Sequence, residues 1–226
     1  MLDMWTTLLP LMIGSAIVPI QIIITILLLK TPGGIRTAMA WVGGMTSVRL
    51  AQGVLFGLVF TASTQTESGN DGPGVVSSVL LLVVALLFFV TGAKQLLTHE
   101  DEDAPPPKWM SAVSSMTPKK AFLIGAGLLI IGAKFWVFTL SGISAISDAQ
   151  LSLAAAAGVF LIFVVVSEIA HISVLAIATL MPKRSDVLLE RMTTWLSANN
   201  RIIMIILGAV FGTWFMIKAL TGLGVL

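Results

Sequence analysis

Residues 151–181, LSLAAAAGVFLIFVVVSEIAHISVLAIATLM, form a long apolar stretch whose ionisable side chains are Glu168 and His171. A run of about 20 predominantly apolar residues is long enough to cross the hydrocarbon core of a bilayer as an α-helix. The stretch therefore predicts a transmembrane helix that carries a carboxylate and an imidazole near the middle of its length.

Five further stretches have the same apolar character. They cover residues 5–29, 37–61, 75–97, 121–146 and 202–226. Across the whole chain, 57% of residues are hydrophobic and 11% are charged, and the mean hydropathy is +1.00. Soluble domains carry about 25% charged residues, so this chain lacks the polar groups needed to cover a water-exposed surface. The sequence predicts an all-α integral membrane protein with six transmembrane helices.

Lys and Arg residues are confined to alternate connections between the predicted helices. The second and fourth connections have none, and the basic residues of the others are Lys30 and Arg36 in the first, Lys108, Lys119 and Lys120 in the third, and Lys183, Arg184 and Arg191 in the fifth. Connections rich in Lys and Arg stay in the cytoplasm. We therefore expect a multi-pass protein of the inner (plasma) membrane with both termini on the extracytoplasmic side.

The charged and proline-containing segment 99–120 divides the chain into residues 1–98 and residues 121–226, each with three predicted helices. Because three is an odd number, the two halves enter the membrane in opposite directions. This is the arrangement of an inverted-topology repeat, which in secondary transporters holds the substrate near the midplane at the interface of the halves. The sequence thus predicts a 3+3 inverted repeat joined by a cytoplasmic linker.

Three charged residues lie near the middle of predicted helices: Arg49, Lys134 and Glu168, with His171 one helical turn after Glu168. Intramembrane charges are costly and are usually paired and functional. If Glu168 pairs with one of the cations, the other is left to bind an anionic group such as a phosphate, sulfate or carboxylate. Glu168 and His171 are also candidates for a proton relay. The alternative is an ion pair that only locks the helices together.

Pro19 interrupts the first predicted helix, and Gln21 follows it inside the apolar stretch. Proline leaves a helix carbonyl without its usual donor, and at membrane depth a neighbour or a ligand must satisfy that carbonyl. The equivalent part of the second half is rich in glycine, with Gly125, Gly127 and Gly132. We therefore include Pro19 and Gln21 with Arg49 and Lys134 as candidate substrate-binding residues, although close helix packing also explains the small residues.

Composition argues against several other classes of function. The chain has no Cys and only two His residues, so the sequence predicts no metal site and no cofactor. The pair Glu168 and His171 matches one half of a di-metal carboxylate site, but the second half is missing. The net charge of +2 gives no indication of nucleic-acid binding, and no catalytic cluster is present, so we do not expect an enzyme.

The pattern Gly14-x-x-x-x-Pro19-Ile20, a glycine-rich second helix, and Phe122-x-x-Gly125 followed by Lys134 resemble the lysine-exporter (LysE) superfamily. Within it, the chain is most similar to the GAP group, the glycopeptidolipid- and sulfolipid-addressing proteins of actinobacteria. The resemblance implies outward translocation of an envelope glycolipid or its precursor. The superfamily commonly has Asn-Pro-Lys in the fourth helix, where this chain has Gly132-Ala133-Lys134, which puts a broken fourth helix in doubt.

Three functional interpretations follow. The first is a transporter or flippase for an anionic or glycosylated lipid, with Arg49 and Lys134 holding the headgroup. The second is a proton-coupled exporter of a small solute such as an amino acid or an ion. The third is a non-enzymatic accessory subunit of a lipid-export complex. The partner is thus a lipid or a small molecule within the membrane, and both a homodimer and association with envelope-lipid export machinery remain open.

Overall fold

The computed structural model describes residues 2–64, 75–97, 112–113 and 115–226. The regular structure of these residues is helical, in agreement with the predicted class. The helices are α1 (Leu2–Ala16), α2 (Pro19–Leu29), α3 (Gly34–Thr64), α4 (Val75–Leu97), α6 (Pro118–Ile131), α7 (Ala133–Asp148), α8 (Leu153–Ser167), α9 (Ile169–Leu180) and α10 (Pro182–Gly222).

Each predicted transmembrane stretch is helical in the structure, but three of the six are bent. Helices α4 and α10 are each long and apolar enough to cross a membrane alone. The pairs α1–α2, α6–α7 and α8–α9 meet that requirement together and bend by 47°, 69° and 60°. Helix α3 is long, but its Arg, Gln, Ser, Thr and Gly residues make it less apolar than α4. The chain is therefore a membrane-embedded helical protein with two to five candidate spans by length and composition.

Two of these bends correct the sequence analysis. The fourth predicted helix does break, at Gly132, although the chain has no proline there. Gly132 has φ −75° and ψ 93°, an extended conformation that ends α6 and starts α7. The fifth predicted helix, expected to be continuous, breaks at Glu168, which ends α8 and precedes α9. The break at Pro19 was expected, because proline cannot continue the hydrogen bonding of a helix that precedes it.

The sixth predicted helix is also longer than expected. Helix α10 begins at Pro182, whereas the sequence placed residues 182–201 in a connection. Its 41 residues correspond to roughly 60 Å, about twice the thickness of a hydrocarbon core. The first part of α10 therefore extends beyond the depth that one span requires, and it contains the charged residues Asp186, Glu190 and Arg191.

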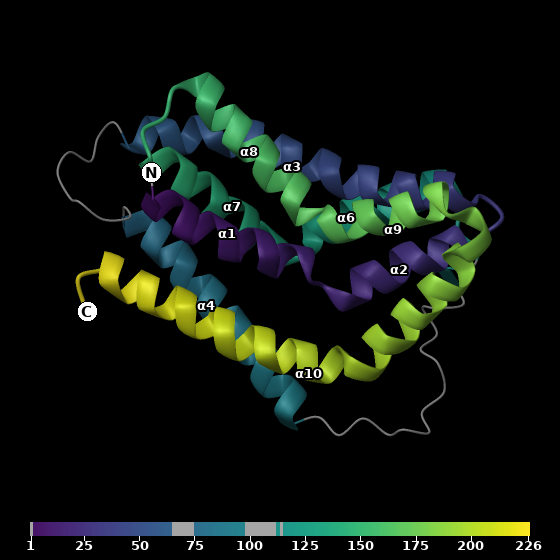
Figure 1. Ribbon diagram of the computed structural model, residues 1–226. Coiled ribbons are helices and arrows are strands. Elements are labelled where there is room, and N and C mark those ends of the chain that lie inside the picture. The colour runs from purple at the N-terminus through teal and green to yellow at the C-terminus, as the bar shows by residue number, and fades with distance from the viewer. Residues whose placement is uncertain (1, 65–74, 98–111, 114) are drawn as a thin grey trace.

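The helices are arranged so that the broken pair α1–α2 runs through the middle of the molecule (Figure 1). Helix α4 packs along α10 on one side, and α3 packs along α6 on the other. Both chain ends lie at the same end of the molecule (Figure 1). Each of these extensive contacts joins a helix from residues 1–98 to a helix from residues 121–226.

Glycine residues allow the closest approaches between helices. A Cβ atom added to Gly208 in α10 would lie 2.8 Å from the Cα atom of Gly92 in α4. Likewise, a Cβ atom on Gly44 or Gly125 would overlap the backbone of the partner helix at the crossing of α3 and α6. Such small-residue contacts are typical of helix association in membranes, where the hydrophobic effect does not drive helices together.

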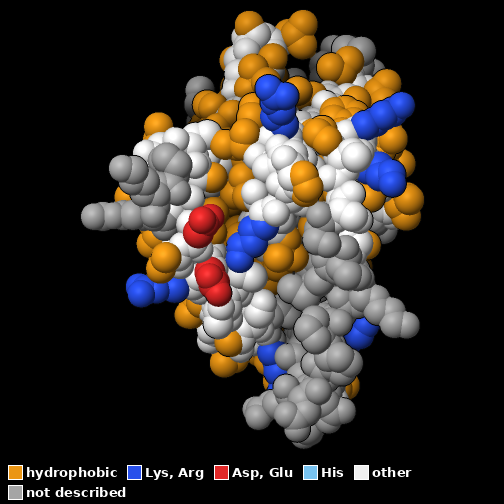
Figure 2. Space-filling view, turned by 90° about the vertical axis from the view of Figure 1, so that its right-hand side faces the viewer, with side chains coloured by type: hydrophobic (Ala, Val, Ile, Leu, Met, Phe, Trp, Pro, Cys, Tyr) orange, Lys and Arg blue, Asp and Glu red, His pale blue; other side chains and the backbone are white. Residues whose placement is uncertain are grey.

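The sides and the end of the molecule have different surfaces. Many large apolar side chains are exposed, including Val54 at 69%, Val90 at 65% and Val210 at 56%. Apolar exposure on this scale is typical of a surface covered by lipid. At the end formed by the α2–α3 and α9–α10 turns, Lys and Arg side chains gather (Figure 2). Lys30 and Arg36 are exposed in the α2–α3 region of this end.

Candidate functional site

The helix breaks surround a buried cluster of polar side chains. Arg49 Nη1 in α3 lies 3.5 Å from Glu168 Oε1 at the α8–α9 break, and both side chains are 3% exposed. His171 Nε2, in the first turn of α9, lies 3.7 Å from Glu168 Oε2. The expected pairing of Glu168 with a mid-helix cation is thus present, and Arg49 is the cation. The two carboxylate oxygens face different partners, a guanidinium and an imidazole.

Arg49 also contacts helix α1. Its Nη2 donates a hydrogen bond of 2.9 Å to Ser15 Oγ, in the last turn of α1 before the break. The guanidinium therefore connects α1, α3 and the α8–α9 break. A planar guanidinium has five N–H donors, so an anion that displaces Glu168 could bind Arg49 while the bond to Ser15 is kept.

His171 reaches helix α2 through its other ring nitrogen. His171 Nδ1 lies 2.9 Å from Thr25 Oγ1, and both residues are buried. The Thr25 hydroxyl also lies 2.9 Å from the carbonyl oxygen of Gln21, to which it can donate. The side chain of Gln21 is itself 1% exposed. His171 of the fifth predicted helix is thus joined through Thr25 to the backbone carbonyl of Gln21.

Several buried polar atoms of the cluster residues, and of Ser167 and Gln52 close to them in sequence, have no hydrogen-bond partner within the described residues. They are Arg49 Nε and Nη1, both Glu168 carboxylate oxygens, Gln21 Nε2, Ser167 Oγ, and both side-chain polar atoms of Gln52. Gln52 follows Arg49 by one helical turn, so it lies on the same face of α3. Buried polar groups are nearly always hydrogen-bonded, so water or a polar ligand is needed to bond these atoms.

Two helix N-termini lie at the level of this cluster. Helix α9 begins at Ile169, directly after Glu168, and α2 begins at Pro19, after the first break. The first N–H groups of a helix have no acceptor inside the helix, and they form the positive end of its dipole. In transporters with broken helices, such ends point at the anionic group of the substrate. The same breaks also bring the negative C-terminal ends of α1 and α8 to this level, and Arg49 bonds Ser15 in the last turn of α1.

Lys134, the other predicted cation, is the second residue of α7 and follows the break at Gly132. Its side chain lies outside the described residues, so its role stays a prediction. Pro19 is buried as the first residue of α2. Sequence analysis did not single out Ser15, Thr25 or Gln52 as site residues, although Thr25 is an isolated polar residue within an apolar stretch. That feature is the signal by which Thr25 can be found.

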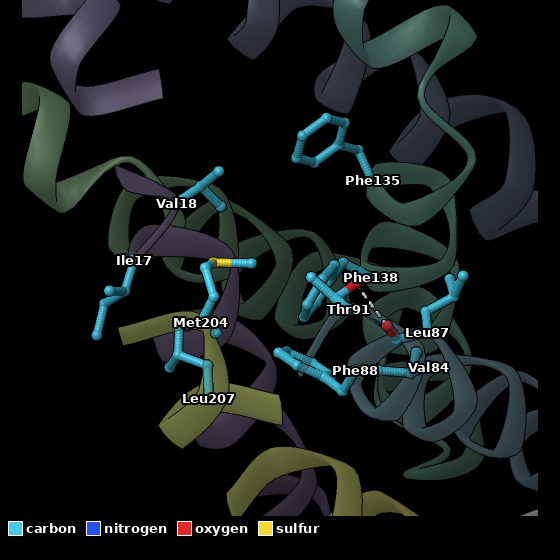
Figure 3. A pocket seen from close by; sticks show the side chains of 11 residues that line it. Ile17, Val18, Val84, Leu87, Phe88, Thr91, Phe135, Phe138, Met204 and Leu207 are labelled. Carbon is cyan, nitrogen blue, oxygen red and sulfur yellow. Dashed lines mark hydrogen bonds between the residues drawn. The ribbon is translucent and has the colours of Figure 1, made fainter. Parts of the chain in front are cut away.

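An apolar groove lies beside the first break. Its walls come from α1, α4, α7 and α10, and its lining residues are Gly14, Ile17, Val18, Val84, Leu87, Phe88, Thr91, Phe135, Phe138, Met204 and Leu207 (Figure 3). The groove is narrow, with a volume of about 40 Å³. Its one hydroxyl, on Thr91, donates to the carbonyl oxygen of Leu87, so the surface offered to a ligand is apolar.

The groove and the polar cluster lie close together along α1. Gly14 lines the groove, and the next residue, Ser15, accepts a hydrogen bond from Arg49.

The model of the family described as "Sap, sulfolipid-1-addressing protein" matches residues 8–221 of this chain. The chain belongs to this family. The sulfolipid-1-addressing family model thus covers both the groove and the cluster, as the resemblance to the GAP group had indicated. No curated protein and no solved structure matches the chain.

Proposed function

We propose that this member of the sulfolipid-1-addressing family carries an anionic envelope lipid, such as a glycolipid precursor, across the inner membrane. The observation that carries the proposal is the position of the buried Arg49 cluster and the apolar groove on either side of the α1–α2 break. A lipid needs both surfaces, because its headgroup is polar and its chains are apolar. The printed name of the family, which refers to a sulfolipid, supports the same class of ligand.

Arg49 is the residue that would hold the headgroup. Its Nε and Nη1 make no hydrogen bond within the described residues, although Nη1 faces Glu168 at 3.5 Å. A guanidinium binds sulfate or phosphate oxygens through two parallel hydrogen bonds, which a lysine cannot do. Lys134 would add a second positive charge from α7. Gln21 would donate to the headgroup through its unpartnered Nε2.

The contacts between helices support a six-span inverted repeat as the carrier. If residues 1–98 and 121–226 are equivalent, exchanging the halves converts the packing of α3 against α6 and α7 into packing of α8–α9 against α1–α2, and α8 does contact α1 and α9 does contact α2. Gly92 and Gly208 approach each other in α4 and α10, the helices that the repeat would make equivalent, and Arg49 and Glu168 join α3 to the α8–α9 break in the same way. Rocking of one half against the other would then expose the cluster to each side in turn.

The orientation in the proposal follows from the charged end of the molecule. Lys and Arg gather at one end (Figure 2), and both termini lie at the opposite end (Figure 1). With the basic end in the cytoplasm, an anionic headgroup would be attracted to the protein from the cytoplasmic leaflet. The lipid would enter there and leave toward the outer leaflet.

Native mass spectrometry of the purified full chain tests the proposal. We expect the wild-type protein to retain an anionic lipid from the host membrane, and Arg49→Gln to lose it. Arg191→Gln is a matched control, because Arg191 is exposed on the outer part of α10. Equal retention of anionic lipid by the Arg49→Gln variant, with the protein monodisperse, would contradict the proposal.

A second candidate function is the export of a small anionic solute. The observation that favours it is the small volume of the apolar groove. About 40 Å³ is room for only a few water molecules in this conformation. Such a solute would occupy the Arg49 cluster alone. Retention of a small organic anion without any acyl chain in the same mass-spectrometry experiment would support this candidate over a lipid.

A further inference from the structure

We infer that His171 is a proton-binding site whose protonation prepares Arg49 to bind the anionic headgroup, so that the proton and the anion bind together. The inference rests on the proposed function and names its coupling ion. It follows from the hydrogen bonds that join His171, Thr25 and Gln21, and from the two faces of the Glu168 carboxylate.

The Thr25 hydroxyl has one proton and two neighbours that can accept it. The Gln21 carbonyl oxygen and His171 Nδ1 each lie 2.9 Å from Thr25 Oγ1. When His171 is neutral, the hydroxyl donates to Nδ1, and the ring carries its hydrogen on Nε2, toward Glu168. When His171 is cationic, Nδ1–H donates to the hydroxyl, which turns to donate to Gln21. Rotation of one hydroxyl therefore satisfies both charge states of the imidazole.

The carboxylate of Glu168 favours the protonation of His171 because its two oxygens face separate partners. Oε1 faces Arg49 at 3.5 Å, and Oε2 faces His171 at 3.7 Å. Proton uptake by the imidazole from water thus places a second cation beside a carboxylate that already neutralises Arg49. No heavy-atom bond changes, and the only groups that move are the proton and the Thr25 hydroxyl.

Protonation changes the net charge of the cluster. With neutral His171, the charges of Arg49 and Glu168 cancel. With cationic His171, the cluster has a net charge of +1, and the described elements around it add no other charge. The neighbouring parts of α1 and α2 contribute the uncharged Ser15, Gln21 and Thr25, and α10 contacts α9 through apolar residues. Helix α7 carries Lys134, whose side chain lies outside the described residues.

A net positive cluster is the form that accepts an anion. A headgroup that binds Arg49 competes with Glu168 for the guanidinium, and a cationic His171 compensates the carboxylate that Arg49 releases. Each binding event therefore favours the other by the same factor, because coupling free energies are reciprocal. For one proton, the affinity for the anion changes by at most tenfold per pH unit.

Equilibrium binding to the purified full chain in neutral detergent tests this coupling. The probe is phosphatidylglycerol, whose phosphodiester stays ionised throughout, and phosphatidylcholine is the zwitterionic control. We measure the affinity for phosphatidylglycerol from about pH 4 to about pH 8 and expect it to fall about tenfold or more as the pH rises. The affinity of the His171→Gln variant should stay at the high-pH level throughout.

Thr25 provides a second test that leaves the imidazole in place. Thr25→Val removes the acceptor for Nδ1–H, so it should lower phosphatidylglycerol affinity at low pH and leave the affinity at high pH unchanged. Thr25→Ser should restore the wild-type pH profile. Thr179→Val is the matched control, because the exposed Thr179 hydroxyl bonds only carbonyl groups of its own helix.

Two results would overturn the inference. If wild-type binding to phosphatidylglycerol does not depend on pH but is lost in Arg49→Gln, the proposed function stands and the proton coupling is wrong. If no pH yields binding to phosphatidylglycerol, the proposed lipid function fails together with the coupling. Should His171→Gln not fold, the Thr25→Val and Thr25→Ser pair decides the matter.

Discussion

Arg49 and Glu168 face each other across 3.5 Å at the point where the fifth predicted helix changes direction. The distance is within the range of an ion pair but the two atoms share no hydrogen bond. A pair that only locks helices together is expected to have close, saturated hydrogen bonds, because desolvation of both charges must be offset. The loose geometry therefore agrees better with a pair that separates when a ligand binds.

This pair should nevertheless matter for stability. Glu168→Gln leaves a buried guanidinium without its counter-charge, which we expect to cost about 3–5 kcal/mol. The double variant Arg49→Met/Glu168→Met should lose less free energy of unfolding than the sum of the losses in the single variants Arg49→Met and Glu168→Met. The reason is that no buried charge remains unpaired in the double variant. Unfolding in detergent, followed by circular dichroism, measures these differences. Additive losses in the double variant would show that the two side chains do not interact.

The α4–α10 contact depends on the absence of side chains at Gly92 and Gly208. Gly208→Val should destabilise the protein by about 1–3 kcal/mol, because its side chain would press on the α4 backbone. Gly158→Val is the control, since a Cβ atom on Gly158 meets nothing within 4 Å. Both variants can be compared by thermal unfolding in detergent. Equal melting temperatures for the two variants would mean that α4 and α10 are not closely packed there.

Filling the apolar groove should block lipid without disturbing the charges. Met204 lines the groove, and Met204→Trp should reduce retention of anionic lipid about tenfold or more in native mass spectrometry. Ile206→Trp is the matched control, because Ile206 is 54% exposed on the outer surface of the same helix. Unchanged retention in Met204→Trp would place the acyl chain elsewhere.

The orientation can be tested directly because the chain contains no cysteine. Ser152→Cys, before α8, and Lys30→Cys, after α2, are each exposed single-cysteine positions. A membrane-impermeant thiol reagent added to intact cells should label Ser152→Cys and label Lys30→Cys only after the cells are opened. Labelling of both positions from outside would refute six spans with the basic end in the cytoplasm.

The sequence predicted the features of this fold that depend on hydrophobic length. The third predicted helix and α4 have the same bounds, residues 75–97, because a polar loop precedes it and a charged segment follows it. The break before Pro19 was also predictable from the covalent structure of proline. These features depend on local properties of the chain, which a single sequence contains.

The breaks at Gly132 and Glu168 were not predictable in the same way. Gly132 has no left-handed backbone, and Glu168 lies inside a long apolar stretch without proline or glycine beside it, so neither residue is a strong local breaking signal. Tertiary contacts override helical propensity at such positions. The cluster was predictable in part, because the charges of Arg49 and Glu168 stand out. The contact of Thr25 with His171 depends on how α2 and α9 pack together, and no sequence spacing shows it.

Transbilayer movement of lipid tests the central proposal most directly. Fluorescent phosphatidylglycerol and fluorescent phosphatidylcholine are placed in vesicles that contain the wild-type chain or Arg49→Gln, and the fraction of each lipid that changes leaflet is measured with an impermeant quencher. We expect the wild-type chain to move phosphatidylglycerol faster than phosphatidylcholine, and Arg49→Gln to lose that preference. Equal movement of phosphatidylglycerol by both proteins would contradict a headgroup site at Arg49.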